Sequence, residues 1–508
     1  MEYRTGLAWV FAVVMAGPLM LQPPAAKAAD EEATPAPAVT EGQPATASEE
    51  PPPTVAEATP APAVSESAPS QAASRVVHNV TVRGDLFATA GADVEPVRQP
   101  ISLEARFAFT EQPEPAAGAG VLVRRYTVAA ASIDADGVAS RRLLGRDCRE
   151  VLVTVRGTTV TPYLADGFLA REEADLLDTP FDPLLVDGLR PEGPVAVGDT
   201  WKVQADLAAG LLAIDTVESG GLDASLVEVA DGRAQVRLAG TVTGGVDGAP
   251  TRLEVTGLAT VAATSDEPAG PWRLEGRVAD LEATIKERRQ ASWVAPGLDV
   301  EARVVIHRVD GDAMPADAGG ADQPPTEDLG PAVADRPRGQ GRPGAVWHRH
   351  PGGRYAVVMD GRWRVIEDGP EGLVMRFVDR GALIGQCSIL PLPPTAADTP
   401  PTEETVRVDV RRSLADQFGH IAESEASTRE DGTRVVRVVV DGAAEGRPFR
   451  WIHHVLTDPA GHQAAVTFMM EPVLADRFAA ADRELVAGLV VLREPPPRSA
   501  AAADPERQ

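Results

Sequence analysis

The histidines come nearest to the spacing of a metal site. His348 and His350 lie two residues apart on a predicted strand, so their side chains share one face. A zinc site needs three or four ligands and a hydrogen-bonded outer shell, and no third ligand is apparent beside this pair. The sequence therefore favours an exposed pair without a metal.

A second histidine group lies near the C-terminus. His453 and His454 are neighbours on a predicted strand, and His462 follows shortly after them. Adjacent strand residues point to opposite faces, so His453 and His454 cannot chelate one ion together. We expect packed or hydrogen-bonded histidines here, and the sequence predicts no metal site and no cofactor.

Two acidic motifs could be a calcium site and a catalytic acid, but each is explained more simply as a turn. Asp134–Gly137 resembles the start of a calcium loop but lacks the carboxylates required at the fifth and twelfth positions. Asp199 stands between Gly198 and Trp201, where it could be a catalytic acid beside an aromatic ring. A Gly-Asp turn followed by a buried tryptophan explains the same residues locally, and we favour it.

The two cysteines are predicted to differ in environment. Cys387 lies on an apolar strand face and should be buried, whereas Cys148 is surrounded by charged residues and should be exposed. A bridge between them would tie two predicted domains across a linker, which we disfavour. Their redox state is left open.

Motifs of the common enzyme classes are absent from the sequence. Serine hydrolases, zinc proteases, P-loop nucleotidases and thiol oxidoreductases use GxSxG, HExxH, GxxxxGK[ST] and CxxC, none of which occurs. We therefore predict a protein that is not an enzyme and assign no catalytic residue.

Charge excludes further classes. The 508 residues include 48 basic and 75 acidic side chains, a formal net charge of −27 that repels nucleic-acid phosphates and anionic lipids. Aromatic residues make up 4%, which leaves few candidates for a base-stacking platform. We expect no nucleic-acid partner.

The N-terminus resembles an export signal. Arg4 precedes the apolar run Leu7–Leu21, and Ala26-Lys27-Ala28 fits a signal-peptidase site. We predict a signal peptide over residues 1–28 and an exported bacterial protein, periplasmic or extracellular, with no transmembrane segment in the mature chain. An uncleaved anchor is the alternative, although the run is short for a membrane span.

Composition divides the rest of the chain. We predict a disordered Ala/Pro/Glu linker (29–74), an antiparallel β-rich domain (75–309), a second disordered linker (310–344), an α+β domain (345–494) and a disordered tail (495–508). The first domain alternates apolar and polar residues and carries Asp-Gly turns, with helices predicted at Ala170–Leu177 and Ala205–Ile214. With its VGDxW turn, it resembles uncharacterised exported bacterial proteins.

The second domain shows three strands, a helix, three strands and a final helix. The predicted helices are Glu403–Phe418, capped by Thr402, and Pro472–Leu492, each with an apolar stripe. The fold class predicted for the chain is α+β, with α/β/α layers around an antiparallel sheet in this domain.

Five segments of this domain resemble the PsbP-like family, in its bacterial exported branch. They are DGRWRV, MRFVDRGALIGQCSI, TRVVRVVVDG, RWIHHVLTDPAGHQAAVTFMM and RFAAADRELVAGL. The resemblance implies a binding or accessory domain without known chemistry, and no functional residue carries over.

Two functions remain open. The first is an exported, non-catalytic protein whose two modules bind an unidentified partner protein. The alternative is a carrier or sensor that holds an apolar ligand in a curved N-terminal sheet, similar to the LolA/LolB lipoprotein carriers. An open apolar cavity would favour the carrier, and a filled core would favour the partner-binding protein.

Overall fold

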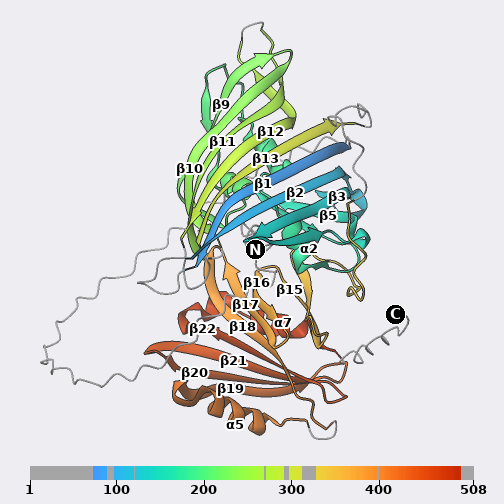
Figure 1. Ribbon diagram of the computed structural model, residues 1–508, viewed down its shortest axis with the longest axis vertical. Helices are drawn as coiled ribbons and strands as arrows, with labels where there is room; N and C mark the ends of the chain where they lie inside the picture. The colour runs from blue at the N-terminus through green and yellow to red at the C-terminus, as the bar shows by residue number, and fades with distance from the viewer. Residues whose placement is uncertain are drawn as a thin grey trace, which may run out of the picture. The chain divides into compact units, whose positions relative to one another are not determined.

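Strands with alternating apolar and polar side chains form most of the computed structural model (Figure 1). The structure describes residues 73–88, 97–118, 120–246, 248–267, 270–290, 297–311, 328–396 and 400–492. In these residues the first sheet has 12 strands, and all of its paired neighbours are antiparallel. Its strands, in sheet order, are β6 (Thr159–Tyr163), β5 (Glu150–Arg156), β3 (Val121–Ala135), β2 (Val97–Pro113), β1 (Ser74–Ala88), β13 (Gly297–Asp310), β12 (Arg273–Arg289), β11 (Ala249–Thr264), β10 (Arg233–Val246), β9 (Thr216–Ala230) and β8 (Thr200–Lys202), with β4 (Val138–Leu143) paired to β3.

Tight turns connect several of these strands. Asp136 and Gly137 join β3 to β4 with φ angles of 52° and 80°, and Asp231 and Gly232 join β9 to β10 with 51° and 72°. Two successive positive φ values define the turn that suits the right-handed twist of a hairpin. These Asp-Gly turns are where the sequence predicted them.

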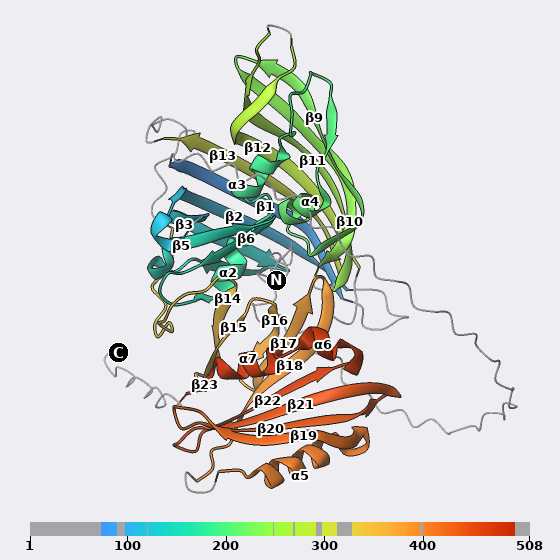
Figure 2. The same cartoon turned by 180° about the vertical axis from the view of Figure 1, so that it is seen from behind.

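One face of the first sheet is covered by short helices, α3 (Pro183–Val186) and α4 (Ala205–Leu212), which Figure 2 shows in front of the strands. The apolar side chains of α4 and of the inward strand positions form one core in which Leu211, Leu212 and Ile214 have no exposed surface. The opposite face carries polar side chains, including Lys286 and Arg303. Alternation thus separates a packed face from a solvated one.

A small joining sheet contains strands from both halves of the chain. Its strands are β23 (Leu489–Val491), β15 (Tyr355–Asp360), β14 (Ala345–Arg349) and β7 (Leu169–Ala170), and β14 pairs with β7 in parallel. Helix α2 (Arg171–Leu177) follows β7, and Nη1 of Arg171 donates to the carbonyls of Gly361 and Trp363 at 2.8 and 3.2 Å. All described residues fall in one compact unit.

The second sheet has seven strands within the described residues. In sheet order they are β16 (Trp363–Gly369), β17 (Gly372–Asp379), β18 (Ala382–Leu392), β22 (Gln463–Met470), β21 (Arg447–Thr457), β20 (Arg434–Ala444) and β19 (Phe418–Thr428).

Helices pack on this sheet through two separate apolar clusters. Helix α5 (Glu403–Leu414) buries Val406, Val410 and Leu414 in one cluster, and α6 (Ala475–Phe478) and α7 (Ala481–Ala487) contribute to the other. Thr402 caps α5 by accepting a hydrogen bond from the Thr405 N–H at 3.1 Å.

The predicted α+β class with α/β/α layers is wrong, because the chain is mostly β and is built from large antiparallel sheets. The single helix expected over 472–492 is instead a 3₁₀ turn, α6, α7 and strand β23. Ala479 interrupts it with φ of 51°. Residues 418–428, which lack an apolar alternation, form edge strand β19 where no strand was predicted.

Several predicted segments fall outside the described residues. These are the signal peptide, nearly all of the first linker, residues 312–327 of the second linker and the C-terminal tail. Residues 328–344 are described and lie along the first sheet. The predicted domain boundaries stay predictions. Among the described helices, none combines the length and apolar character needed to span a membrane.

Candidate functional site: a buried charged cluster under the first sheet

Helix α3 starts at a residue that also belongs to the main buried cluster. Asp182 precedes Pro183, whose fixed φ suits the first helical position, and its Oδ1 accepts from the Leu184 N–H at 2.9 Å. This cap fixes the Asp182 carboxylate under the sheet, where it faces Arg124 of β3.

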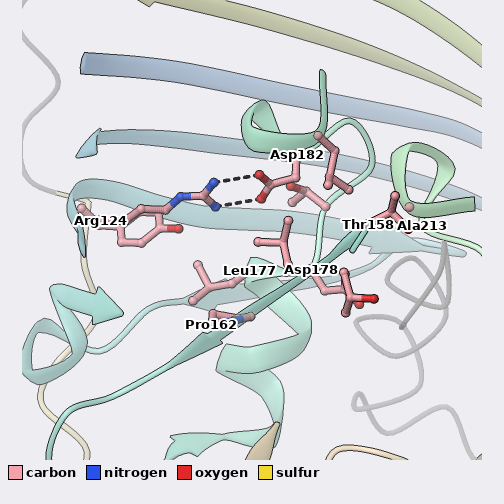
Figure 3. Close-up of a pocket in the computed structure, with 13 residues that line it drawn as sticks. Arg124, Thr158, Pro162, Leu177, Asp178, Asp182 and Ala213 are labelled. Carbon is pink, nitrogen blue, oxygen red and sulfur yellow. Dashed lines mark hydrogen bonds and ion pairs between the residues drawn. The ribbon is translucent and has the colours of Figure 1, made fainter. Parts of the chain in front are cut away.

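Arg124 forms a two-bond pair with that carboxylate (Figure 3). Its Nη1 and Nη2 donate to the two Asp182 oxygens at 2.8 and 2.7 Å, and its Nε donates to Glu111 Oε2 on β2 at 2.9 Å. The three side chains are 5%, 9% and 0% exposed, and the guanidinium lies 4.9 Å from the centre of the Phe109 ring. The cluster therefore ties two strands to α3 in the interior.

Two further arginines make ion pairs beside this cluster. Arg308 of β13 donates to Asp187 at 2.8 Å and to the Pro183 carbonyl at 2.6 Å. Arg277 of β12 lies 3.8 Å from Glu111. Opposite charges are thus paired, which offsets part of the cost of removing each from water.

The central pair stays charged at neutral pH. Burial alone would lower the pKa of Arg124 and raise that of Asp182. Their mutual attraction and hydrogen bonds outweigh burial, so the pKa of Arg124 is raised and that of Asp182 is lowered. Such a pair specifies one arrangement of the layers more than it adds stability.

His78 of β1 borders this cluster and is neutral at pH 7. Burial lowers its pKa to about 4, with Asp182 opposing and Arg124 adding to the shift. Its Nδ1 lies 3.4 Å from Thr179 Oγ1, and its Nε2 has no hydrogen-bond partner among the described residues. The ring is 5.8 Å from Phe107, so it packs as an aromatic residue.

A cavity of about 40 Å³ lies beside the pair and is lined by Tyr126, Thr158 and Asp178, among others (Figure 3). Burial raises the pKa of Asp178 well above its ordinary value and raises that of Tyr126 to about 12. Thr158 Oγ1 has no partner in the described part of the chain. This volume admits about two or three water molecules.

The charged groups of the cluster hold β2, β3 and α3 in place relative to one another. The carboxylates of Glu111 and Asp182 bind Arg124, and the cavity beside them is lined by hydroxyl and carboxyl groups that can hold water. In the described ranges, no three or more His, Cys, Asp or Glu side chains are placed to hold a metal ion.

A second buried cluster lies under α7. Oδ2 of Asp482 accepts from Arg437 Nε of β20 at 2.9 Å and lies 3.0 Å from His454 Nε2 of β21. Arg437 also donates to Glu423 of β19 at 2.7 Å. The carboxylate of a helix is thus held by two strands of the second sheet.

The first histidine pair is not exposed as predicted. His350 is 2% exposed, packs 4.8 Å from the Tyr355 ring and lies 3.1 Å from the Gly369 carbonyl. The His348 side chain is 12% exposed, and its Nε2 lies 3.5 Å from Asp368. The prediction failed because residues that follow in the sequence contact the pair: Tyr355 of β15 packs on His350, and Asp368 and Gly369 of β16 lie beside the two rings.

The second histidine group matches its prediction more closely. His453 and His454 lie on opposite faces of β21: His453 Nδ1 lies 3.0 Å from Thr467 Oγ1, and His454 reaches Asp482. His462 lies 2.9 Å from Asp458 in the turn before β22.

The acidic motifs are turns, as favoured. Asp199 accepts from the Ala196 N–H at 2.8 Å. Trp201 was expected to be buried but is only partly buried; it packs on the first core, and its indole N–H donates to the Leu189 carbonyl at 2.9 Å. Asp134 accepts from the Gly137 N–H at 3.0 Å in the β3–β4 hairpin.

Both cysteines are free thiols, and both are buried. Burial was predicted for Cys387 but not for Cys148. Cys148 Sγ lies 3.7 Å from Glu173 Oε2, and burial, followed by the charge of Glu173, raises the pKa of the thiol. Its charged neighbours in sequence, Arg146, Asp147, Arg149 and Glu150, are exposed, whereas Cys148 itself is buried.

The buried ionisable groups were missed by sequence reasoning, although two of them, Glu111 and His78, carried a signal. Glu111 continues the inward alternation of Phe107 and Phe109, and His78 stands between the inward Val76 and Val80. A charged or polar group in an inward register predicts a buried partner. Asp182 and Asp482 carried no such signal, because each lies at a helix start.

Comparison with known proteins gives faint likenesses. No family model and no curated protein matches the chain. A cyanobacterial PsbP from Synechocystis sp. PCC 6803 is similar to part of it, with 13% identity over 29% of this chain and 92% of that one, at a TM-score of 0.24.

Two other solved structures are similar over longer stretches. A lipovitellin structure on lipid-protein interactions shares 12% identity over 49% of this chain, which spans 26% of lipovitellin, at a TM-score of 0.25. A Rh. blastica porin shares 10% identity over 78% of this chain and 98% of the porin, at a TM-score of 0.12. These likenesses assign no function to the chain.

Proposed function

We propose that the protein is exported and non-catalytic, and that it binds a protein partner through the open face of the first sheet. The open face consists of the outward side chains of β1, β2 and β10–β13, which no helix covers in Figure 1. These strands are 14 to 17 residues long. A face of that extent offers the area that a specific protein interface needs.

The charges of the open face fit a protein partner. Lys286 lies 3.6 Å from Glu301, and Arg303 lies 2.7 Å from Glu282, each pair joining β12 to β13. The signs alternate on this face, although the whole chain carries −27. A mixed pattern complements a mixed protein surface and gives specificity more than raw affinity.

The buried groups support a non-catalytic role. Arg124 binds both Glu111 and Asp182, and Asp482 is bound by Arg437 and His454. Carboxylates held in this way act as fixed anchors and not as acids or bases.

The packing under the first sheet favours partner binding over the carrier alternative. Phe181 and Leu212 have no exposed surface and fill the space between α4 and the strands. The cavity at Arg124 measures about 40 Å³, which is small beside the hundreds of Å³ typical of ligand pockets.

Two exposed lysines allow a direct test. Apart from Lys27 in the predicted signal peptide, the chain has Lys202 and Lys286, whose side chains are 80% and 63% exposed. Lys286 lies on β12, an inner strand of the open face, and Lys202 lies on edge strand β8. Cells that export the protein would be treated with an amine-reactive cross-linker, and adducts would be mapped by mass spectrometry.

We expect a partner protein linked through Lys286, and we expect Lys286→Arg to abolish that adduct without changing expression. Lys202→Arg is the matched control and should leave the adduct intact. An adduct that survives Lys286→Arg, or no protein adduct at this lysine, would refute binding through the open face.

A further inference from the structure

Residues 328–344, which we call the strap, run along the first sheet before entering β14. The strap contains four glycines and three prolines in seventeen residues, the composition that predicted a linker. Single bridges attach it at three places, Asp328 to Val128, Gly330 to Gly145, and Gln340 to Asp166. It is therefore docked without forming a regular strand.

Arg336 makes the densest set of contacts in the strap. Its Nη1 and Nη2 donate to the two oxygens of Glu173 at 2.8 and 2.9 Å, and its Nε donates to Asp147 at 2.7 Å. Nη1 also donates to the Phe168 carbonyl at 2.8 Å. The side chain is 10% exposed, so one arginine is buried between the strap and α2.

Glu173, the acceptor of Arg336, is also held by residues outside the strap. Glu173 accepts the N–H groups of Gly145 and Ala170 at 3.1 and 2.8 Å, and its side chain is 3% exposed. Cys148, with no exposed surface, lies next to the same carboxylate. Opening the strap would bring water to Glu173 and Cys148.

Apolar packing contributes little to the docking of the strap. Leu329 packs on the first core, whereas Ala332, Ala334, Arg338 and Arg342 are exposed. A segment with few buried apolar contacts opens at a free energy well below that of global unfolding. Its closure then depends on the polar contacts around Arg336.

We propose that the strap opens and closes as one unit, that Arg336 holds it closed, and that the open form uncovers Cys148. This conformational device is separate from binding through the open face. Because the strap continues directly into β14, which pairs with β7, its opening also loosens the strand that joins the two halves of the chain. The strap then has two states, an open one that its Gly- and Pro-rich composition allows and the docked one seen in the structure.

Thiol labelling of the full chain tests this proposal, because the two cysteines report on different places. Cys148 contacts Glu173, the carboxylate that Arg336 of the strap binds, whereas Cys387 lies in the core of the second sheet and reports global unfolding. Labelling rates by a disulfide reagent would be measured in native buffer, with the sites resolved by mass spectrometry. Circular dichroism would confirm that each variant is folded.

In Arg336→Ala we expect labelling of Cys148 to rise by at least about tenfold, or about 1.4 kcal/mol of closure, with Cys387 unchanged. Arg338→Ala, on the exposed side of the same strap, is the matched control and should label like the wild type. Parallel acceleration of both cysteines, or equal effects of the two arginine variants, would overturn the proposal.

A backbone variant gives a second, independent arm. A Cβ on Gly341 would lie 1.7 Å from the Leu164 carbonyl oxygen, so Gly341→Ala should prevent closure and also accelerate labelling of Cys148. Gly369→Ala meets nothing within 4 Å and serves as its control. Unchanged labelling in a folded Gly341→Ala protein would show that the strap does not cover the thiol.

Discussion

His454 and Asp482 meet beneath α7, where the histidine Nε2 lies 3.0 Å from the aspartate Oδ2 and both side chains are 2% exposed. Arg437 donates to the same oxygen. Burial alone would raise the pKa of Asp482, but the hydrogen bonds from His454 and Arg437 lower it. One carboxylate therefore anchors the helix to two strands.

Removing that carboxylate should weaken the second sheet. We expect Asp482→Ala to lower the free energy of unfolding by about 3–5 kcal/mol, because Arg437 loses its buried partner. Denaturant unfolding followed by circular dichroism measures the change. Asp476→Ala, at an exposed position of α6, should cost far less. Equal losses would show that α7 is not anchored through Asp482.

The apolar side of α7 gives a second prediction. Leu485 is 1% exposed in the core that includes Phe468 and Phe478. Leu485→Ala should destabilise the protein by about 2–5 kcal/mol, since it leaves a cavity as well as losing transfer energy. The control is Val473→Ala, whose side chain is 81% exposed and should change the midpoint little.

His78 should make stability depend on pH. Its folded pKa of about 4 lies below the ordinary 6.5, so its contribution is complete above pH 6.5 and is lost as the pH falls towards 4. Between pH 7 and pH 5 this loss amounts to about 2 kcal/mol.

Urea unfolding of His78→Gln at the two pH values checks this. We expect a smaller stability difference in the variant than in the wild type. An unchanged pH dependence in His78→Gln would place the titrating group elsewhere.

Arg124 should matter more to stability than any surface arginine. Arg124→Met leaves Asp182 and Glu111 buried without their main cation and should cost about 3–5 kcal/mol. Adding Asp182→Asn should recover part of that loss, because one uncompensated charge disappears. Arg98→Met, at a side chain 62% exposed, is the control. Thermal melting of the four proteins would rank them.

Periodicity predicted the parts of the fold in which burial is one-sided. The alternation of Leu103 and Phe107 in β2 and the stripe of Val406 and Val410 in α5 each recur in the structure, because a packed face imposes a repeat. Strand β19 was not predicted, because most of its residues are exposed and its apolar residues show no periodic repeat. The prediction of one final helix was wrong because the apolar stripe continues on both sides of Ala479, where the helix is interrupted.

The buried sites were beyond the sequence for a different reason. Arg336 and Glu173 are 163 residues apart, and nothing local marks either as a partner of the other. His350 was predicted to be exposed because its contacts with Tyr355 and Gly369 depend on how β15 and β16 return to it. Charge pairing in an interior follows from three-dimensional register, which composition and spacing do not encode.

The pairing of β1 with β13 sets the order in which the chain can mature. Ser74 pairs with Asp310, so the first strand has one open edge until β13 has been made. At a synthesis rate of about 5–20 residues per second, that wait is on the order of tens of seconds. During this interval the unpaired edge of β1 can pair with a strand of another chain. A chaperone that binds the unfolded chain would keep β1 and β2 from pairing with other chains. It would no longer be required once residue 310 is available to complete β13.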